Sequence, residues 1–267
     1  MVCGRVVRGV CAAAVMVGAV VCLDAQTIPS VQPTAKDAHA SFEVAAIKRS
    51  NPDDKSHRFE IHGRRIVIEN QTVQTMIEMS YGVHGRQIVN GPSWIETERF
   101  DAEGVPEGEV PPDVAQFQAL VRSLLAERFG LKLHTEKREM ARYTLTVAKG
   151  GPKIEATKST VASLPSIRAG GNKTSHSLQM ENVSMEDVAK QLQGELDRPV
   201  VDETGLKGRY DFTLKWLRPD AAPAGDADSA LPELFTALQE QAGLKVEPSK
   251  GDVDVLTIDH VEQPQAN

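Results

Sequence analysis

The chain has 267 residues, of which 40% are hydrophobic and 25% are charged, and its formal net charge at pH 7 is −7. This composition allows a buried core and excludes an intrinsically disordered protein. The acidic balance repels phosphate backbones, and 7 Phe, 3 Tyr and 2 Trp are too few for a base-stacking platform, so we expect no nucleic-acid partner.

Residues 1–25 have the pattern of a secretory signal peptide. Arg5 and Arg8 precede an apolar run over 9–23, and a small residue, Ala25, follows it. The run is shorter than the roughly 20 residues that a membrane-spanning helix needs, which favours cleavage over a membrane anchor. We therefore expect an exported protein, periplasmic or secreted, with no stable membrane span after signal removal.

The three cysteines, Cys3, Cys11 and Cys22, all lie in this segment. Cleavage after Ala25 would leave a mature chain with no disulfide, no thiolate nucleophile and no cysteine metal site. Cys22 also raises a lipoprotein interpretation. Val21 in front of it makes that interpretation the less favoured one, because lipoprotein processing requires a small residue there.

The first half of the mature chain alternates between strand and helix patterns. Residues 26–40 are polar and contain prolines, which is typical of a flexible tether. In residues 41–149, Phe42, Val44 and Ala46 indicate an opening strand by their alternation. The elements expected next are strand 64–70, helix 72–82, two strands around the turn at 90–92, helix 113–130 with its glycine cap, and a hairpin over 131–150.

Residues 150–177 lack a sustained period and are expected to be a linker. The pattern then resumes in residues 178–264. A strand precedes a helix that Ser184 and Asp187 are expected to cap, as an S-x-x-[DE] pair. Two strands, a helix and a closing strand pair complete this half.

Matching residues recur in the two halves at an offset of about 110 to 113. "RQIVNGPSWIETERFD" at 86–101 resembles "RPVVDETGLKGRYDF" at 198–212, and Asn70 matches Asn182. We infer an internal duplication. The predicted fold class is α+β, with two tandem copies of a β-α-β-β-α-β-β unit, each a mainly antiparallel sheet braced by two helices.

An Arg-aromatic-Asp sequence occurs in both halves on a predicted strand. Alternation places the aromatic residues in the core and the charged residues on the opposite face; the core set is Phe100, Tyr210 and Phe212, and the charged set is Arg99, Asp101, Arg209 and Asp211. The charged residues could form local ion pairs within a repeated scaffold, which is the favoured interpretation. The alternative is a binding surface, because Arg offers a planar fork to a carboxylate.

Three further residues have predicted structural roles. Gly130 and Gly243 follow helices at matching places, and Trp94 is expected to fill the space between sheet and helix. A platform for a sugar or an aromatic ligand is the alternative for Trp94.

No known catalytic or metal-binding motif occurs. The seven His residues have no zinc-ligand spacing, and the nucleophile elbow, the P-loop and the dinucleotide-binding turn are missing from the sequence. Pairs such as Asp53 with Asp54 or Asp252 with Asp254 could suggest a glycosidase, but any acidic chain offers such pairs. We expect no metal, no cofactor and no enzymatic activity.

Long strings of the sequence resemble an uncharacterised family of exported proteins from soil bacteria, especially acidobacteria. They include "NGPSWIETERFD", "LLAERFGLKLHTEKREMARYTLTVAKGGPK" and "RPVVDETGLKGRYDFTLKW", and the resemblance covers about residues 41–264. It implies an envelope or secreted location. Some relatives are attached to a membrane metallopeptidase that resembles an antibiotic sensor, but this chain resembles the stand-alone form.

The favoured functional hypothesis is a non-enzymatic envelope module that binds an envelope protein or a small ligand. A secreted hydrolase whose site is assembled from distant residues is one alternative. A regulator of a membrane metallopeptidase is another, and it depends on the resemblance alone.

Overall fold

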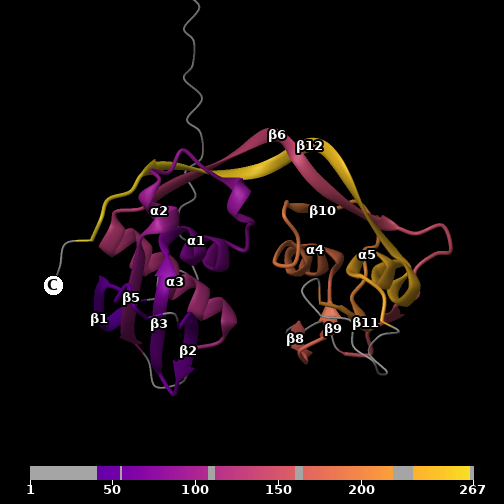
Figure 1. The fold of residues 1–267 in the computed structure, drawn as a ribbon, viewed down its shortest axis with the longest axis horizontal. Helices are drawn as coiled ribbons and strands as arrows, with labels where there is room; N and C mark the ends of the chain where they lie inside the picture. The colour runs from indigo at the N-terminus through magenta and orange to yellow at the C-terminus, as the bar shows by residue number, and fades with distance from the viewer. Residues whose placement is uncertain (1–40, 55, 108–111, 160–164, 219–230, 265–267) are drawn as a thin grey trace, which may run out of the picture.

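A computed structural model of the chain describes residues 41–54, 56–107, 112–159, 165–218 and 231–264. The expected signal peptide and tether, residues 1–25 and 26–40, lie outside this part. The described residues form a mixed α+β structure in which two lobes lie beneath an arch of two long strands (Figure 1). None of their helices combines the length and apolar character that a bilayer crossing requires.

The first lobe contains an antiparallel sheet in the order β1-β5-β3-β2. Its strands are β1 (Phe42–Arg49), β2 (Arg58–His62), β3 (Arg65–Thr72) and β5 (Arg99–Pro106), and its helices are α1 (Val73–Tyr81), α2 (Trp94–Thr97) and α3 (Val114–Phe129). Met76, Phe100 and Phe129 are fully buried where the helices meet the sheet. Helix α3 ends at Gly130, whose φ of 59° confirms the expected glycine cap.

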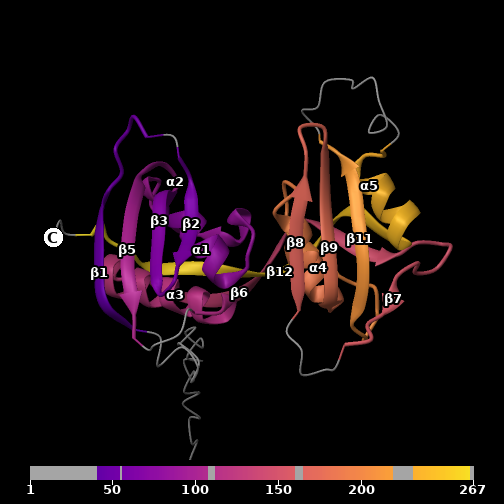
Figure 2. The same cartoon turned by 90° about the horizontal axis from the view of Figure 1, so that it is seen from below.

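The second lobe contains a sheet in the order β7-β11-β9-β8 (Figure 2). Its strands are β7 (Glu155–Ala156), β8 (Ser166–Gly171), β9 (Ser175–Val183) and β11 (Tyr210–Leu217), and its helices are α4 (Met185–Gln193) and α5 (Leu234–Ala237), which continues into a π-helical turn, η4 (Leu238–Ala242). Ser184 and Asp187 form the predicted capping box of α4. Gly243 ends η4 with φ 65°, and a side chain there would meet the carbonyl oxygen of Gly151 at 2.2 Å.

A third sheet, in the order β10-β6-β12-β4, joins the lobes. Its members are β4 (Ile88–Val89), which follows a 3-10 turn, η2 (Gly85–Gln87), and β6 (Lys132–Val147), β10 (Val200–Asp202) and β12 (Leu244–His260). The long strands β6 and β12 pair antiparallel and cross from one lobe to the other above the gap (Figure 1).

The lobes exchange strand segments through this sheet. The short strand β4 of the first half pairs with β12, and β10 of the second half pairs with β6, both in parallel. Leu256 and Ile258 of β12 therefore lie in the core of the first lobe, whereas Leu145 of β6 lies in the core of the second. Each lobe is completed by residues from the other half of the sequence.

The structure differs from the predicted elements at the two longest strands. The hairpin expected over 131–150 is wrong, because β6 is one continuous strand, and the closing pair of the second half is likewise the single strand β12. The charged run at 136–139 resembles a turn in the sequence, but it contains no glycine, proline or asparagine. Its residues instead pair with those of β12.

Two smaller differences concern the start of each lobe. The interval 150–177, expected to be a linker, contains β7, β8 and the first residues of β9. In β1, Ile47 is buried and Ala46 is exposed, which is opposite to the expected alternation. A register shift between Phe42 and Val44 explains the change, because an irregular residue reverses the face of those that follow it.

Candidate functional site

The aromatic residues of the repeated motif pack against the two cores. Phe100 is fully buried and contacts Phe129 edge to face at a centroid distance of 5.1 Å. Tyr210 and Phe212 are half-buried against the core of the second lobe. Trp94 is also half-buried and stacks on Phe129 at 6.4 Å, so it contributes to packing between α2 and α3.

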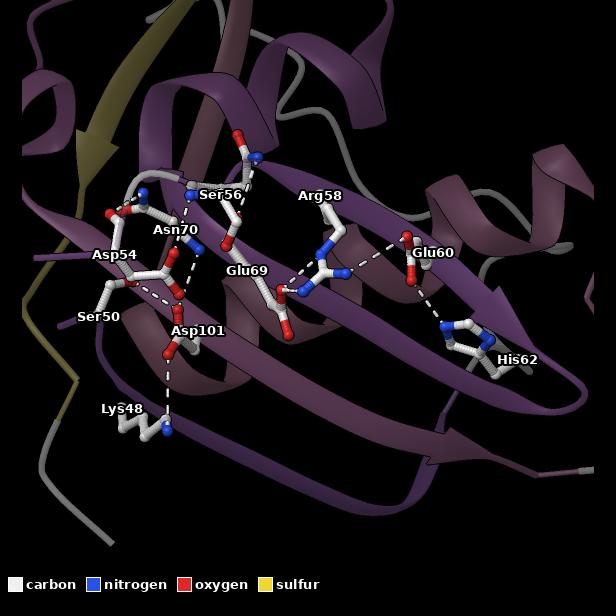
Figure 3. Close-up of polar contacts among 11 residues, drawn as sticks. Lys48, Ser50, Asp54, Ser56, Arg58, Glu60, His62, Glu69, Asn70 and Asp101 are labelled. Atoms are coloured by element: carbon white, nitrogen blue, oxygen red, sulfur yellow. Dashed lines mark hydrogen bonds and ion pairs between the residues drawn. The ribbon is translucent and has the colours of Figure 1, made fainter.

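The aspartates of the motif each accept a hydrogen bond from the backbone of an asparagine. The Asp101 carboxylate accepts from the Asn70 N–H at 3.0 Å, and the Asp211 carboxylate accepts from the Asn182 N–H at 2.7 Å. The Asp101 carboxylate also accepts a hydrogen bond from the Ser50 hydroxyl at 2.6 Å and forms an ion pair with the Lys48 ammonium at 3.6 Å (Figure 3).

The arginines bind the other backbone group of the same asparagines. Arg99 Nη1 donates to the Asn70 carbonyl at 2.9 Å, and Arg209 Nη1 donates to the Asn182 carbonyl at 2.6 Å. Both asparagines have φ 55°, and the strand register shifts beside each of them. Arginine and aspartate therefore hold a β-bulge, whose backbone groups would otherwise lack partners.

This arrangement differs from the predicted local ion pair. The motif residues in each lobe meet at one asparagine and bond its backbone rather than each other. Arg99 and Asp101 lie on the sheet of the first lobe, and Arg209 and Asp211 lie on the sheet of the second, so the four do not form one site.

Hydrogen bonds to the Asp211 carboxylate shift the pKa of that group. The backbone N–H of Asn182 donates to its carboxylate, and the hydroxyl of Thr157 and the backbone N–H of Lys158 do so as well. These donors stabilise the charged form and lower the pKa of Asp211 below its ordinary value.

One cavity lies beside Asn70 in the first lobe. Its volume is about 480 Å³, and its lining includes Ser50, Asp54, His57 and Arg99. We call it the Arg99 pocket. His57 Nδ1 lies 2.9 Å from the same Asn70 carbonyl that accepts from Arg99, so the bulge positions both side chains at the pocket.

A larger cavity, of about 870 Å³, lies between the lobes, and we call it the interlobe groove. One wall is formed by α1 and the residues that follow it, including Glu78 and His84. The other is formed by the end of α4 and the residues that follow it, including Lys190 and Leu196. The helices α1 and α4 face each other across the gap beneath the arch (Figure 1).

His84 joins the two walls of the groove. Its Nδ1 accepts from the Arg86 N–H at 3.0 Å, and this contact begins the η2 turn. Because Nδ1 is the acceptor, the proton is assigned to Nε2, which lies 3.3 Å from the Leu196 carbonyl of the second lobe. Arg86 also reaches across, to Asp197 at 3.9 Å.

Sequence reasoning did not identify His57, His84 or Lys190 as site residues. Each stands alone in the sequence, without a motif partner, and becomes part of a cavity only through tertiary contacts. Asn70 and Asn182 carried a signal, since each repeats before a helix and asparagine tolerates positive φ. Within the described ranges, no three or more His, Cys, Asp or Glu side chains are arranged to hold a metal ion.

The family model described as "Protein of unknown function (DUF3738)" matches residues 74–261. The chain belongs to this family. The match begins in α1 and ends after β12, so it includes both walls of the interlobe groove and both strands of the arch. Comparison with curated proteins and with solved structures produced no match.

Proposed function

We propose that the chain is an exported, non-enzymatic binding or interaction module of the cell envelope, and that its ligand or partner protein occupies the interlobe groove. The groove itself is the observation that carries this proposal. Its volume of about 870 Å³ falls within the 300 to 1,000 Å³ typical of ligand sites, and both lobes contribute to its lining.

The contacts of the charged groups support binding over catalysis. Lys190 pairs with Glu186 at 2.7 Å, and the Glu78 carboxylate accepts from the Gln74 amide at 3.0 Å. Both ring nitrogens of His84 are engaged with the backbone. These side chains therefore have structural partners, and the repeated Arg and Asp residues hold bulges rather than meeting at a reaction centre.

We also propose that the two lobes are copies of one ancestral α+β unit. The recurring Asn bulge supports this, because Asn70 and Asn182 precede helices of the same length with the same Arg and Asp contacts. The pairing of β4 with β12 and of β10 with β6 supports it as well, because the two exchanges are reciprocal.

Two alternatives stay open as proposals. A secreted hydrolase would need a nucleophile or an acid and base pair assembled in the groove. Regulation of a membrane metallopeptidase depends on the resemblance to exported soil-bacterial proteins. If a substrate or a peptidase partner occupies the same groove, the groove variants described next test these alternatives as well.

A photo-crosslinking residue in place of Gln193, which lines the groove, should capture a defined ligand or partner from an envelope fraction. The same residue in place of Thr213, exposed on β11, should not. Gly194→Trp should block the capture by filling the groove, whereas Gly150→Trp, with open space around it, should leave it intact. Equal capture at both positions would contradict a groove site.

Export and catalysis have separate tests. Deletion of residues 1–25 should retain the chain in the cytoplasm, whereas the full chain should appear in the periplasm or the medium. Hydrolysis of ester, peptide or glycoside substrates that Gly194→Trp abolishes and Gly150→Trp preserves would replace the binding proposal with the hydrolase.

A further inference from the structure

We propose that the Arg99 pocket binds a small oxyanion, a carboxylate or a phosphate group. The pocket, of about 480 Å³, has no lining residue in common with the interlobe groove. This inference is therefore independent of the proposed function, and it assigns a second site to the first lobe.

The bulge at Asn70 orients the binding groups. Its carbonyl accepts from Arg99 Nη1 at 2.9 Å and lies 2.9 Å from His57 Nδ1, and Arg99 Nη1 and His57 Nδ1 lie 3.2 Å from each other. The remaining donors of the Arg99 guanidinium, Nε and Nη2, make no hydrogen bond to a described residue. A planar fork with unused donors, held at one end, is suited to an oxyanion.

The matching place in the second lobe lacks this feature. Arg209 also donates to its asparagine, but its guanidinium lies 3.8 Å from the Asp187 carboxylate. The position on α1 that matches Asp187 is Thr75, and no described carboxylate lies within ion-pair distance of Arg99. The charge of the arginine is thus compensated in the second lobe and uncompensated in the first.

The residue that precedes the strand beside each asparagine also differs between the lobes. His57 directly precedes Arg58, which pairs with Glu69, whereas Pro165, which has no polar side-chain atom, directly precedes Ser166, which pairs with Glu181. The first lobe therefore places the His57 imidazole beside its arginine.

The other charged groups of the pocket leave one opposing charge. Arg49 and Glu98 neutralise each other at 2.9 Å. The Asp54 carboxylate accepts from the Ser56 N–H at 2.8 Å, which holds its loop in place (Figure 3). Asp54 is thus the group in the lining that repels an anion, and removal of its charge should strengthen anion binding.

The test is a titration of the full chain with inorganic phosphate and, separately, with acetate at constant ionic strength, followed by NMR shifts of the pocket amides. We expect saturable binding, and the anion that saturates at the lower concentration identifies the preferred chemistry. Arg99→Gln should weaken it by about tenfold or more, because charge-assisted hydrogen bonds are lost. The matched control Arg209→Gln should not change it.

Asp54→Asn should strengthen the same binding several-fold, since asparagine keeps the acceptor for Ser56 and removes the repulsive charge. This variant decides the matter even if Arg99→Gln does not fold. The proposal is overturned if neither anion saturates, if Arg99→Gln binds as the wild type does, if Arg209→Gln loses as much, or if Asp54→Asn binds no more tightly.

Discussion

Asn70 and Asn182 are the residues whose backbone groups the repeated Arg and Asp side chains bind. Each adopts a left-handed conformation with φ 55°, which asparagine tolerates better than most residues. A bulge leaves the N–H and carbonyl of its extra residue without strand partners. An Arg and an Asp two positions apart on the neighbouring strand supply a donor for the carbonyl and an acceptor for the N–H, and this accounts for the spacing.

Replacement of Asn70 tests the backbone argument. Asn70→Ala should lower the free energy of unfolding by about 1 to 2 kcal/mol, because alanine tolerates the left-handed conformation less well than asparagine does. Loss of the side-chain hydrogen bond to the Asp54 carbonyl should lower it further. Asn70→Gly loses the same side-chain hydrogen bond, but glycine adopts positive φ without steric cost, so it should be the milder change. Urea unfolding of both variants measures the difference, and equal losses would contradict strain as its cause.

The lowered pKa of Asp211 predicts that the free energy of unfolding depends on pH. Its folded pKa lies below the ordinary value near 3.9, so its contribution to stability is present above that value and is lost as the pH falls through the folded pKa. The stability gap between wild type and Asp211→Asn should be largest at neutral pH and should narrow below about pH 4. Urea midpoints at pH 7 and in acid check this. A gap that widens in acid would be inconsistent with the assignment.

At the scale of elements, β6 and β12 are extended through the space between the lobes. Their central residues carry charges that pair across the strands, as Lys137 does with Asp254 at 3.7 Å. Lys250 hydrogen-bonds the Glu139 carboxylate and lowers its pKa. These charged side chains are solvated between the lobes. Toward its two ends β6 carries apolar residues instead, and Leu133 and Leu145 enter the cores of the first and second lobes.

Leu256 tests the exchange of strands. It lies in the second half of the sequence but is 6% exposed in the core of the first lobe. Leu256→Ala should cost about 2 to 5 kcal/mol and should reduce hydrogen-exchange protection in α1 and α3 before α4. Asp254→Ala, on the same face and exposed, should have little effect. Loss of protection confined to the second lobe would contradict the observed pairing.

At the scale of the whole molecule, the exchange makes the lobes interdependent. A chain that ends after Gly251 loses Leu256 and Ile258 from the core of the first lobe, together with the strand partner of β4. We expect this truncation to destabilise the first lobe more than the second, as measured by hydrogen exchange. Full protection of α1 in the truncated chain would show that the first half folds without β12.

The sequence predicted local structure well where a short-range rule applies. Helices α1, α3 and α4, the cap at Gly130 and the box of Ser184 with Asp187 were all expected, because their signals lie within a few residues of one another. The hairpin at 131–150 failed because a charged run on a long strand resembles a turn. The bulge contacts of Arg99 were missed because a register shift is not visible without the partner strand.

By itself, the sequence determined the α+β class, the family and the recurrence of Asn, Arg and Asp, since propensities and periodic burial depend on neighbours along the chain. Only the tertiary structure decided that β6 and β12 pair with each other, and that Arg99 and His57 meet at one carbonyl. These contacts join residues far apart in the chain, and their free energy depends on which strand lies alongside, a choice that local sequence does not encode.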